Sequence, residues 1–135
     1  MQHMQPLEIV LVVKIALTLL LWSIPLMLIP LDGLRKLGFP VQQPEIFLRL
    51  LGMAYLSLAL CYFFGLQSQQ DKIYPSDTVW IGILSNGGAF AVLLNSGVRT
   101  TNWKEWGSLA KVFMWISLFA TGMICSSLVI FGPLR

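Results

Sequence analysis

Four apolar stretches dominate this 135-residue chain and limit what it can fold into. Each is long enough to cross the hydrocarbon core of a bilayer, which requires about 20 predominantly apolar residues in a helix. The composition agrees, because 56% of the residues are hydrophobic and 11% are charged, and the mean hydropathy is +0.75. Such values lie outside the usual range of soluble domains. The sequence therefore predicts an all-α integral membrane four-helix bundle that forms a single domain over residues 1–135. The predicted spans cover about residues 7–29, 44–66, 78–98 and 106–131.

The first apolar stretch differs from a secretory signal peptide. It lacks a preceding basic region, exceeds the usual length of the apolar part and has no cleavage-site pattern before Pro30. We therefore expect it to be a retained span. Pro25 should kink this span, because proline cannot donate a backbone hydrogen bond and crowds the carbonyl group of Leu21.

Signals for a helix start precede the three later spans. Pro44 suits the first helical position, because the N–H group that it lacks has no partner there. Ser76 or Asp77 can cap the third span, and Asn102 and Glu105 have the spacing of a variant capping box for the fourth. We expect the helices to begin at these positions.

Basic residues divide unequally between the two sides that four spans define. The side with both termini carries Lys72 and Arg135, whereas the first and third connectors and the span ends beside them carry six basic residues. Because positive residues favour the cytoplasmic side, we expect a bacterial inner-membrane protein with both termini outside the cytoplasm. The net charge of +3 then reflects orientation rather than nucleic-acid binding. The six residues are Arg35, Lys36, Arg49, Arg99, Lys104 and Lys111.

Lys14 lies inside the first apolar stretch, and an ionisable residue within a span is a candidate functional residue. At about 1.5 Å per residue, Lys14 and Asn86 lie at a similar depth, roughly 10 Å below the outer face. Tyr62 and Thr121 fall in the same outer half. One interpretation is a polar ligand-binding pocket in which Lys14 contacts an anion or a carbonyl group. In the alternative, Lys14 extends to the outer head groups and Asn86 only joins helices.

A second polar group lies near the cytoplasmic ends of the second and third spans. Glu45 and Arg49 are four residues apart and share a helix face, and Asn95 and Arg99 fall at a similar depth. These residues either bind a lipid head group or form a salt bridge that joins the second span to the third. We favour the salt bridge.

Small residues recur every four residues on three spans, a pattern typical of close helix packing. We expect these positions to pack against other helices of the chain or of a partner. Residues 85–88 (SNGG) either take part in this packing, which we favour, or unwind the third span to expose carbonyl groups to a ligand. The repeated positions are Ser57, Cys61 and Gly65, then Gly87, Ala91 and Asn95, and finally Ser117, Thr121 and Cys125.

The inventory of reactive side chains is small. Cys61 and Cys125 form no C-x-x-C motif, and the single histidine is His3. A disulfide or redox pair is one interpretation of the two cysteines, although cysteine more often serves as a small apolar residue in helix contacts. We expect no metal site and no cofactor. An enzyme that acts on a lipid or quinone through Arg49 and Tyr55 or Tyr62 is a further alternative, but we favour a protein without enzymatic activity, because no nucleophile–base pair is recognisable.

Residues 47–56 (FLRLLGMAYL), followed by Tyr62 and Gly65, resemble the second span of small DoxX-like bacterial membrane proteins. Residues 37–40 (LGFP) and 86–89 (NGGA) add to the resemblance, which covers most of the chain. It implies a four-helix bundle with Arg49 and Gly52 as family-like positions. Some relatives work beside quinone-linked or thiol-redox partners, but no activity is carried over, because this chain lacks a cysteine pair or histidine for redox chemistry.

Together these features predict a small, non-enzymatic membrane protein. We expect an accessory or assembly subunit, or a lipid- or quinone-contacting module, of a membrane complex. Its partners would be membrane lipid and either further copies of the chain or another membrane protein subunit. The alternative is an oligomeric transporter or channel for a small solute, with Lys14 and Asn86 on the pathway.

Overall fold

The computed structural model describes residues 5–41, 45–99 and 103–133, and in these ranges the regular elements are all helices. Four helical segments are long and apolar enough to cross a membrane. The all-α fold with four candidate spans is therefore confirmed. The segments are Pro6–Leu28, Ile46–Gln70, Ser76–Arg99 and Ser108–Phe131.

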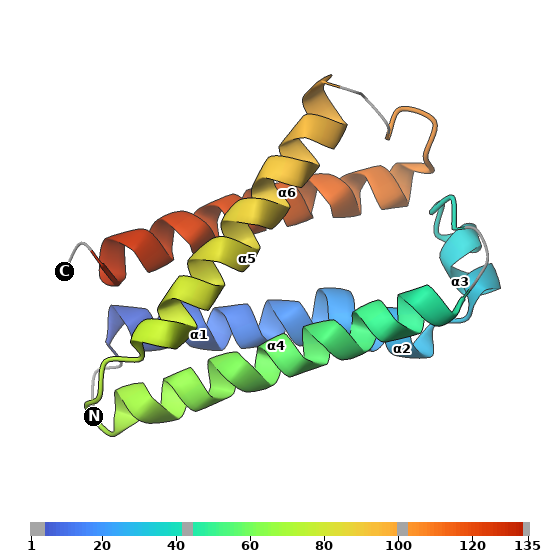
Figure 1. Cartoon of the computed structure of the whole chain (residues 1–135). Helices are drawn as coiled ribbons and strands as arrows, with labels where there is room; N and C mark the ends of the chain where they lie inside the picture. Colours follow the sequence, from blue (N-terminus) through green and yellow to red (C-terminus); the bar gives the residue numbers. More distant parts are fainter. Residues whose placement is uncertain (1–4, 42–44, 100–102, 134–135) are drawn as a thin grey trace.

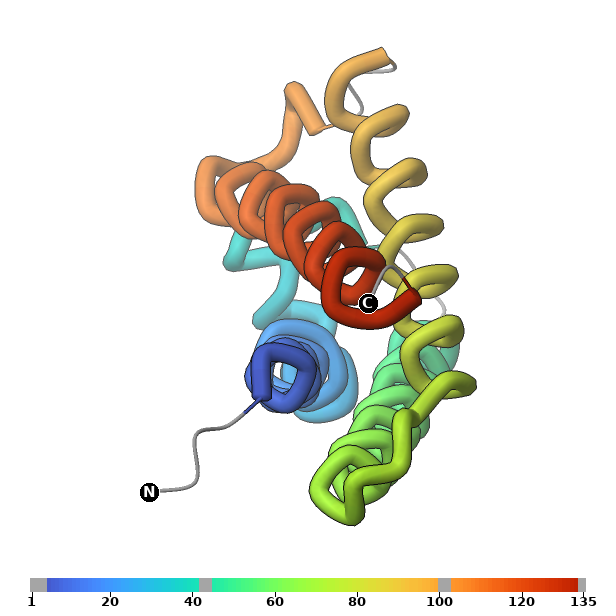
Figure 2. Tube along the Cα trace, turned by 90° about the vertical axis from the view of Figure 1, so that its left-hand side faces the viewer, coloured from blue at the N-terminus to red at the C-terminus, as the bar shows by residue number. Residues whose placement is uncertain are grey.

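The four spans form two antiparallel pairs (Figures 1 and 2). The first span runs beside α4 (Ile46–Gln70), and the short helix α3 (Leu31–Lys36) lies in the connector between them. The second pair is α5 (Ser76–Leu94), which continues as the π-helical turn η2 (Asn95–Arg99), with α6 (Ser108–Phe131). α5 crosses obliquely, so it lies close to α4 at one end and diverges from it toward the other.

The first span changes helix type ahead of Pro25. It consists of α1 (Pro6–Leu17), a π-helical segment η1 (Thr18–Ser23) and α2 (Ile24–Leu28). The wider π-helical turn accommodates Pro25, because proline lacks an N–H group and crowds the turn before it. Ser23, in this wide segment, donates a hydrogen bond of 3.0 Å to the carbonyl oxygen of Gly52, which ties the first span to α4.

Of the three predicted helix starts, that of the third span is confirmed, that of the fourth span was wrong, and Pro44 of the second span lies outside the described residues. α5 begins at Ser76, one of the two expected positions, but its N-cap is Pro75 and not Ser76 or Asp77. α6 begins at Ser108 with Gly107 as its N-cap, because the preceding turn is fixed by a hydrogen bond of 3.0 Å from Gly107 N to Gly38 O. Pro44 and Asn102 are outside the described part of the chain.

The close contact of Gly38 and Gly107 requires glycine at both positions. Gly38 has a φ of 89°, which side chains with a Cβ atom rarely adopt. A Cβ atom on either residue would come within 2.6 Å of the other's Cα atom. The contact therefore holds the connector after α3 against the start of α6.

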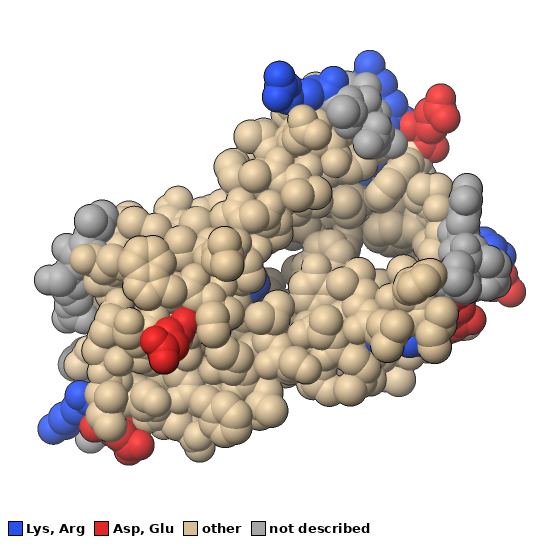
Figure 3. Space-filling model, viewed as in Figure 1, with Lys and Arg blue, Asp and Glu red and all other residues tan. Residues whose placement is uncertain are grey.

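Large apolar side chains are exposed along all four spans. Leu20 is 65% exposed, Leu84 79% and Met123 70%. Charged side chains gather toward the ends of the helices, and the flank between them is apolar (Figure 3). Soluble monomers rarely expose such a surface, whereas a bilayer covers it without penalty. The surface thus fits a membrane protein.

The small residues of the predicted packing positions have different surroundings. Gly65 is buried against Thr78, a Cβ atom on Gly87 would lie 3.3 Å from the sulfur of Cys125, and Ser117 is buried. In contrast, Ser57, Ala91 and Asn95 are exposed. The buried side of α4 instead carries Gly52, Ala59, Tyr62 and Gly65, so Ser57 lies off the contact that this chain makes. Whether a partner packs on Ser57 stays a prediction. Cys61 and Cys125 are half-buried free cysteines.

Two glycines within helices offer a test of this packing. A Cβ atom on Gly65 would lie 2.7 Å from both Cβ and Oγ1 of Thr78, whereas one on Gly88 would meet no atom within 4 Å. We expect Gly65→Ala to lower the free energy of unfolding by about 1–3 kcal/mol, and Gly88→Ala to raise it by up to about 1 kcal/mol, because alanine favours the helix. Unfolding in detergent micelles measures both. Equal stability of the two variants would contradict the predicted contact.

Candidate functional site

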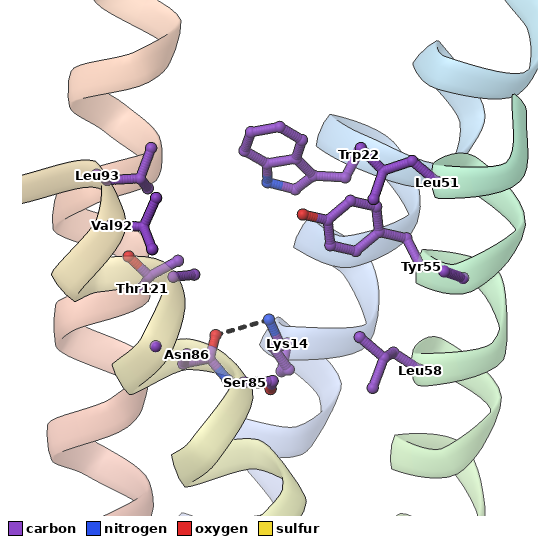
Figure 4. Close-up of a pocket in the computed structure, with 13 residues that line it drawn as sticks. Lys14, Trp22, Leu51, Tyr55, Leu58, Ser85, Asn86, Val92, Leu93 and Thr121 are labelled. Atoms are coloured by element: carbon purple, nitrogen blue, oxygen red, sulfur yellow. Dashed lines mark hydrogen bonds between the residues drawn. The ribbon is translucent and has the colours of Figure 1, made fainter. Parts of the chain in front are cut away.

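A cavity of about 420 Å³ lies between the two helix pairs. Every span contributes to its wall: Lys14 and Trp22 from the first, Tyr55 from α4, Asn86 from α5 and Thr121 from α6 (Figure 4). Figure 3 shows a hollow between the pairs on one flank of the molecule. The oblique course of α5 leaves this space, because α5 and α4 separate where they would otherwise close it.

Lys14 points into the bundle and binds Asn86. Its ammonium group donates a hydrogen bond of 2.7 Å to Oδ1 of Asn86 and lies 5.5 Å from the centroid of the Tyr62 ring. The amide nitrogen of Asn86 donates in turn to the carbonyl oxygen of Gly82 at 2.6 Å. The side chain of Lys14 is thus directed at the third span. It does not extend toward the outer head groups, which was the alternative interpretation of the sequence.

Tyr62 and Thr121 have different places at this site. Tyr62 is fully buried, and its hydroxyl group shares a hydrogen bond of 2.7 Å with the hydroxyl of Ser85, which also donates to the carbonyl oxygen of Gly82. The ammonium group of Lys14 lies over the face of the Tyr62 ring, and Tyr62 does not line the cavity. Thr121 does line the cavity, but its hydroxyl donates within its own helix to the carbonyl oxygen of Ser117 at 2.9 Å.

Residues 85–88 do not unwind the third span, because α5 is continuous through them. Asn86 and Ser85 carry the polar contacts, and Gly88 widens the cavity because it has no side chain. The alternative in which this segment unwinds and exposes carbonyl groups to a ligand is therefore wrong. The backbone groups keep their helical hydrogen bonds, and the side chains of Ser85 and Asn86 supply the polar groups.

Trp22 and Tyr55 were not predicted to lie at this site. Their rings stack with centroids 5.5 Å apart, and both line the cavity. Trp22 lies eight residues after Lys14, about two helical turns, and so lies on a similar face of the first span. That spacing was the signal that could have linked an aromatic side chain to Lys14.

A second cavity, of about 340 Å³, lies next to the first. The two share Trp22 and Leu51 in their walls. The second is lined by apolar and aromatic residues, among them Pro25, Phe39 and Phe113, and extends toward α3 and the start of α6. Taken together, the two cavities therefore have a polar end at Lys14 and an apolar end beyond Trp22.

A void of about 20 Å³ lies beside the polar end, among Lys14, Thr18, Asn86 and Ser117. It is large enough for one water molecule. Thr18 is buried, and its hydroxyl oxygen is the one buried side-chain polar atom of the described residues without a hydrogen-bond partner. Buried polar groups are normally paired, so this hydroxyl marks a place for a water molecule or a polar ligand atom.

The predicted cluster near the cytoplasmic ends does not assemble as expected. Arg49 donates through Nη1 to the carbonyl oxygens of Leu26, at 2.8 Å, and Ile29, at 3.0 Å, and its Nη2 pairs with Glu45. These carbonyl groups end the first span, where no helical donor reaches them. Arg49 thus joins the second span to the first. The prediction of a salt bridge between the second and third spans was wrong.

The other two members of that predicted cluster lie elsewhere. Asn95 and Arg99 belong to η2, at the end of α5 that diverges from α4 (Figures 1 and 2). Equal depth in the membrane placed them beside Arg49 in the sequence analysis, but the oblique course of α5 separates them. A lipid phosphate held jointly by Arg49 and Arg99 is therefore not supported.

No protein-family model matches the chain, and no curated protein or solved structure matches it. The resemblance to DoxX-like membrane proteins therefore stays a prediction. Within the described ranges, no group of three or more His, Cys, Asp or Glu side chains is arranged to hold a metal ion.

The carbonyl contacts of Arg49 predict that lysine cannot replace it. A lysine ammonium is a compact charge and lacks the planar fork that reaches two carbonyl groups and a carboxylate together. We expect Arg49→Lys to lower the free energy of unfolding in detergent by about 1–3 kcal/mol. The control is Arg35→Lys, at an exposed ion pair with Asp32, for which we expect less than about 0.5 kcal/mol. Similar values for the two variants would show that Arg49 does not hold the end of the first span.

Proposed function

We propose that this chain is a non-enzymatic membrane protein that holds a lipid-soluble molecule, a lipid or a quinone, between its two helix pairs. In this proposal it acts as an accessory or assembly subunit of a membrane complex. One observation carries it: two neighbouring cavities that share Trp22 and Leu51 in their walls have a polar end at Lys14 and an apolar end beyond Trp22. That polarity matches a ligand with a polar head and an apolar tail.

The polar end has unused hydrogen-bonding capacity. A lysine ammonium has three N–H donors, and Lys14 uses one of them for Asn86. Its side chain lines the cavity, so its remaining donors are available to an acceptor on a ligand. A ligand with a carbonyl, carboxylate or other oxygen acceptor would satisfy them.

The walls favour a lipid-soluble molecule. Trp22 and Tyr55 supply large aromatic surfaces, and Leu51, Leu58 and Val92 supply aliphatic ones. Sites of this kind, of about 300–1,000 Å³ with few polar groups, are typical of small-molecule binding. The hollow on the flank of the molecule gives such a ligand a route from the bilayer, without a passage through water (Figure 3).

A catalytic role is not part of the proposal. The described polar groups around the cavity are a lysine, an amide, two hydroxyl-bearing residues of the Ser/Thr type and a tyrosine, namely Lys14, Asn86, Ser85, Thr121 and Tyr55. The lysine donates to a neutral amide and does not activate a hydroxyl group. Ligand binding therefore accounts for the geometry with fewer assumptions than a reaction.

The membrane setting of the proposal follows the sequence. A bacterial inner membrane, with both termini outside the cytoplasm, is supported by the distribution of basic residues. Exposed small residues such as Ser57 and Ala91 offer contacts for a partner helix or a second copy. The transporter or channel alternative, with Lys14 and Asn86 on the pathway, would use the same cavity and would require it to open to both sides.

Filling the cavity tests the proposal. Gly88→Leu places an isobutyl group where no atom lies within 4 Å of the new Cβ position. The matched control is Ala91→Leu, on the same helix, at an exposed position outside the cavity wall. We expect wild type and Ala91→Leu to retain a lipid-soluble molecule through purification in mild detergent, and Gly88→Leu to lose most of it. Mass spectrometry of the extracted native protein measures the retained molecule, and an absorption spectrum of the same sample detects a quinone. Equal retention by both variants would rule out the cavity as the site.

A further inference from the structure

The charge at the polar end of the cavity has no counter-charge among the described residues. The ion pairs that the described ranges contain are Arg35 with Asp32 and Arg49 with Glu45, both distant in sequence from Lys14. Lys14 has a neutral amide and an aromatic ring as its partners. An unpaired ammonium inside a membrane span is expensive, and such groups usually face an opposite charge. The missing partner is therefore an anion.

The number of cations at the site limits the charge of that anion. Among the described residues, Lys14 is the one basic residue in the walls of the two large cavities and of the small void. A phosphate monoester carries about 1.5 to 2 negative charges at neutral pH and is usually bound by several basic groups. A carboxylate carries one, which a single lysine balances. The charge balance favours a carboxylate over a phosphate.

The apolar end of the space limits the rest of the ligand. Beyond Trp22 and Leu51, none of the described residues in the wall of the second cavity is charged, and residues such as Phe39 and Phe113 bound it. Its volume of about 340 Å³ lies in the range of sites for one small ligand. This shape fits one extended hydrocarbon chain that continues from a head group at Lys14.

The void beside Lys14 adds an independent observation. The buried hydroxyl of Thr18 lacks a partner there, and Lys14 and Asn86 form part of the same wall. A water molecule in this void can donate to the second oxygen of a carboxylate and also bond to Thr18. The unpaired hydroxyl is thereby accounted for.

We infer that the ligand is a single-chain amphiphile with a carboxylate head, a long-chain fatty acid by chemical class. Its carboxylate binds the ammonium group of Lys14, and its hydrocarbon chain passes Trp22 into the second cavity. This inference rests on the proposed function and specifies the class of molecule that the site holds.

The test compares three probes with the same 18-carbon chain: octadecenoic acid, octadecenol and octadecenoyl lysophosphatidic acid. Each is titrated into the full-length chain in uncharged detergent, and native mass spectrometry counts the bound molecules. We expect one molecule of the acid per chain, with a Kd about tenfold lower than that of the alcohol or of the lysophosphatidic acid. An alcohol or a lysophosphatidic acid that binds as tightly as the acid would overturn the inference.

The variant Lys14→Met tests whether Lys14 causes the preference for the acid over the alcohol. We expect this variant to bind acid and alcohol with similar Kd values, and a far-UV circular dichroism spectrum like that of wild type to show that it is folded. The control is Lys36→Met, at an exposed lysine in α3, which should keep the preference for the acid. A Lys14→Met variant that retains the tenfold preference would also overturn the inference. If Lys14→Met fails to fold, the comparison of the three probes on wild type decides.

Different results would contradict the proposed binding site and the inferred class of ligand. If all three probes bind equally and Gly88→Leu removes them, the cavity binds lipid-soluble molecules but does not select an acid. If no probe binds, and if Gly88→Leu retains the same co-purifying molecules as Ala91→Leu, the cavity is not a binding site and both proposals fail.

Discussion

The hydrogen bond between Lys14 and Asn86 is the interaction on which the arrangement of this bundle depends. It connects the first span to the third across the space between the helix pairs, at 2.7 Å. In a low-dielectric interior, a bond with a charged donor is stronger than in water, and its loss leaves both groups without a partner. Asn86 is held in turn by the carbonyl oxygen of Gly82. The bond thus fixes the cation at the edge of the cavity.

Each helix pair is held together by contacts of its own, and this is why a cavity can persist between the pairs. Ser23 binds the carbonyl oxygen of Gly52, and Arg49 binds those of Leu26 and Ile29, so the first span and α4 are joined at several points. α5 and α6 pack closely where Gly82 meets Leu128 and Gly87 approaches Cys125. The two pairs meet tightly near one end, where Gly65 contacts Thr78, and α5 diverges from α4 toward its other end. The separation places a lysine and two aromatic rings around one space.

The sequence predicted the four spans well, because length and apolarity are local properties of the chain. It also brought Lys14 and Asn86 together, since depth follows from counting residues along a helix. Depth does not give the direction of a side chain around its helix or the crossing angle of two helices. The partner of Arg49 and the separation of Arg99 from it depend on those angles, and so both were missed. The contact of Trp22 with Tyr55 likewise depends on how the first span packs against α4.

A double-mutant cycle on Lys14 and Asn86 tests the central interaction most directly. The variants Lys14→Met and Asn86→Leu and their combination are unfolded reversibly in mixed detergent micelles, and the free energy of unfolding is measured for each. A direct hydrogen bond between the two residues predicts a coupling free energy of about 1–2 kcal/mol, near the upper end for polar contacts in membrane bundles. Additive effects of the two substitutions, with a coupling near zero, would contradict the contact and the site built on it.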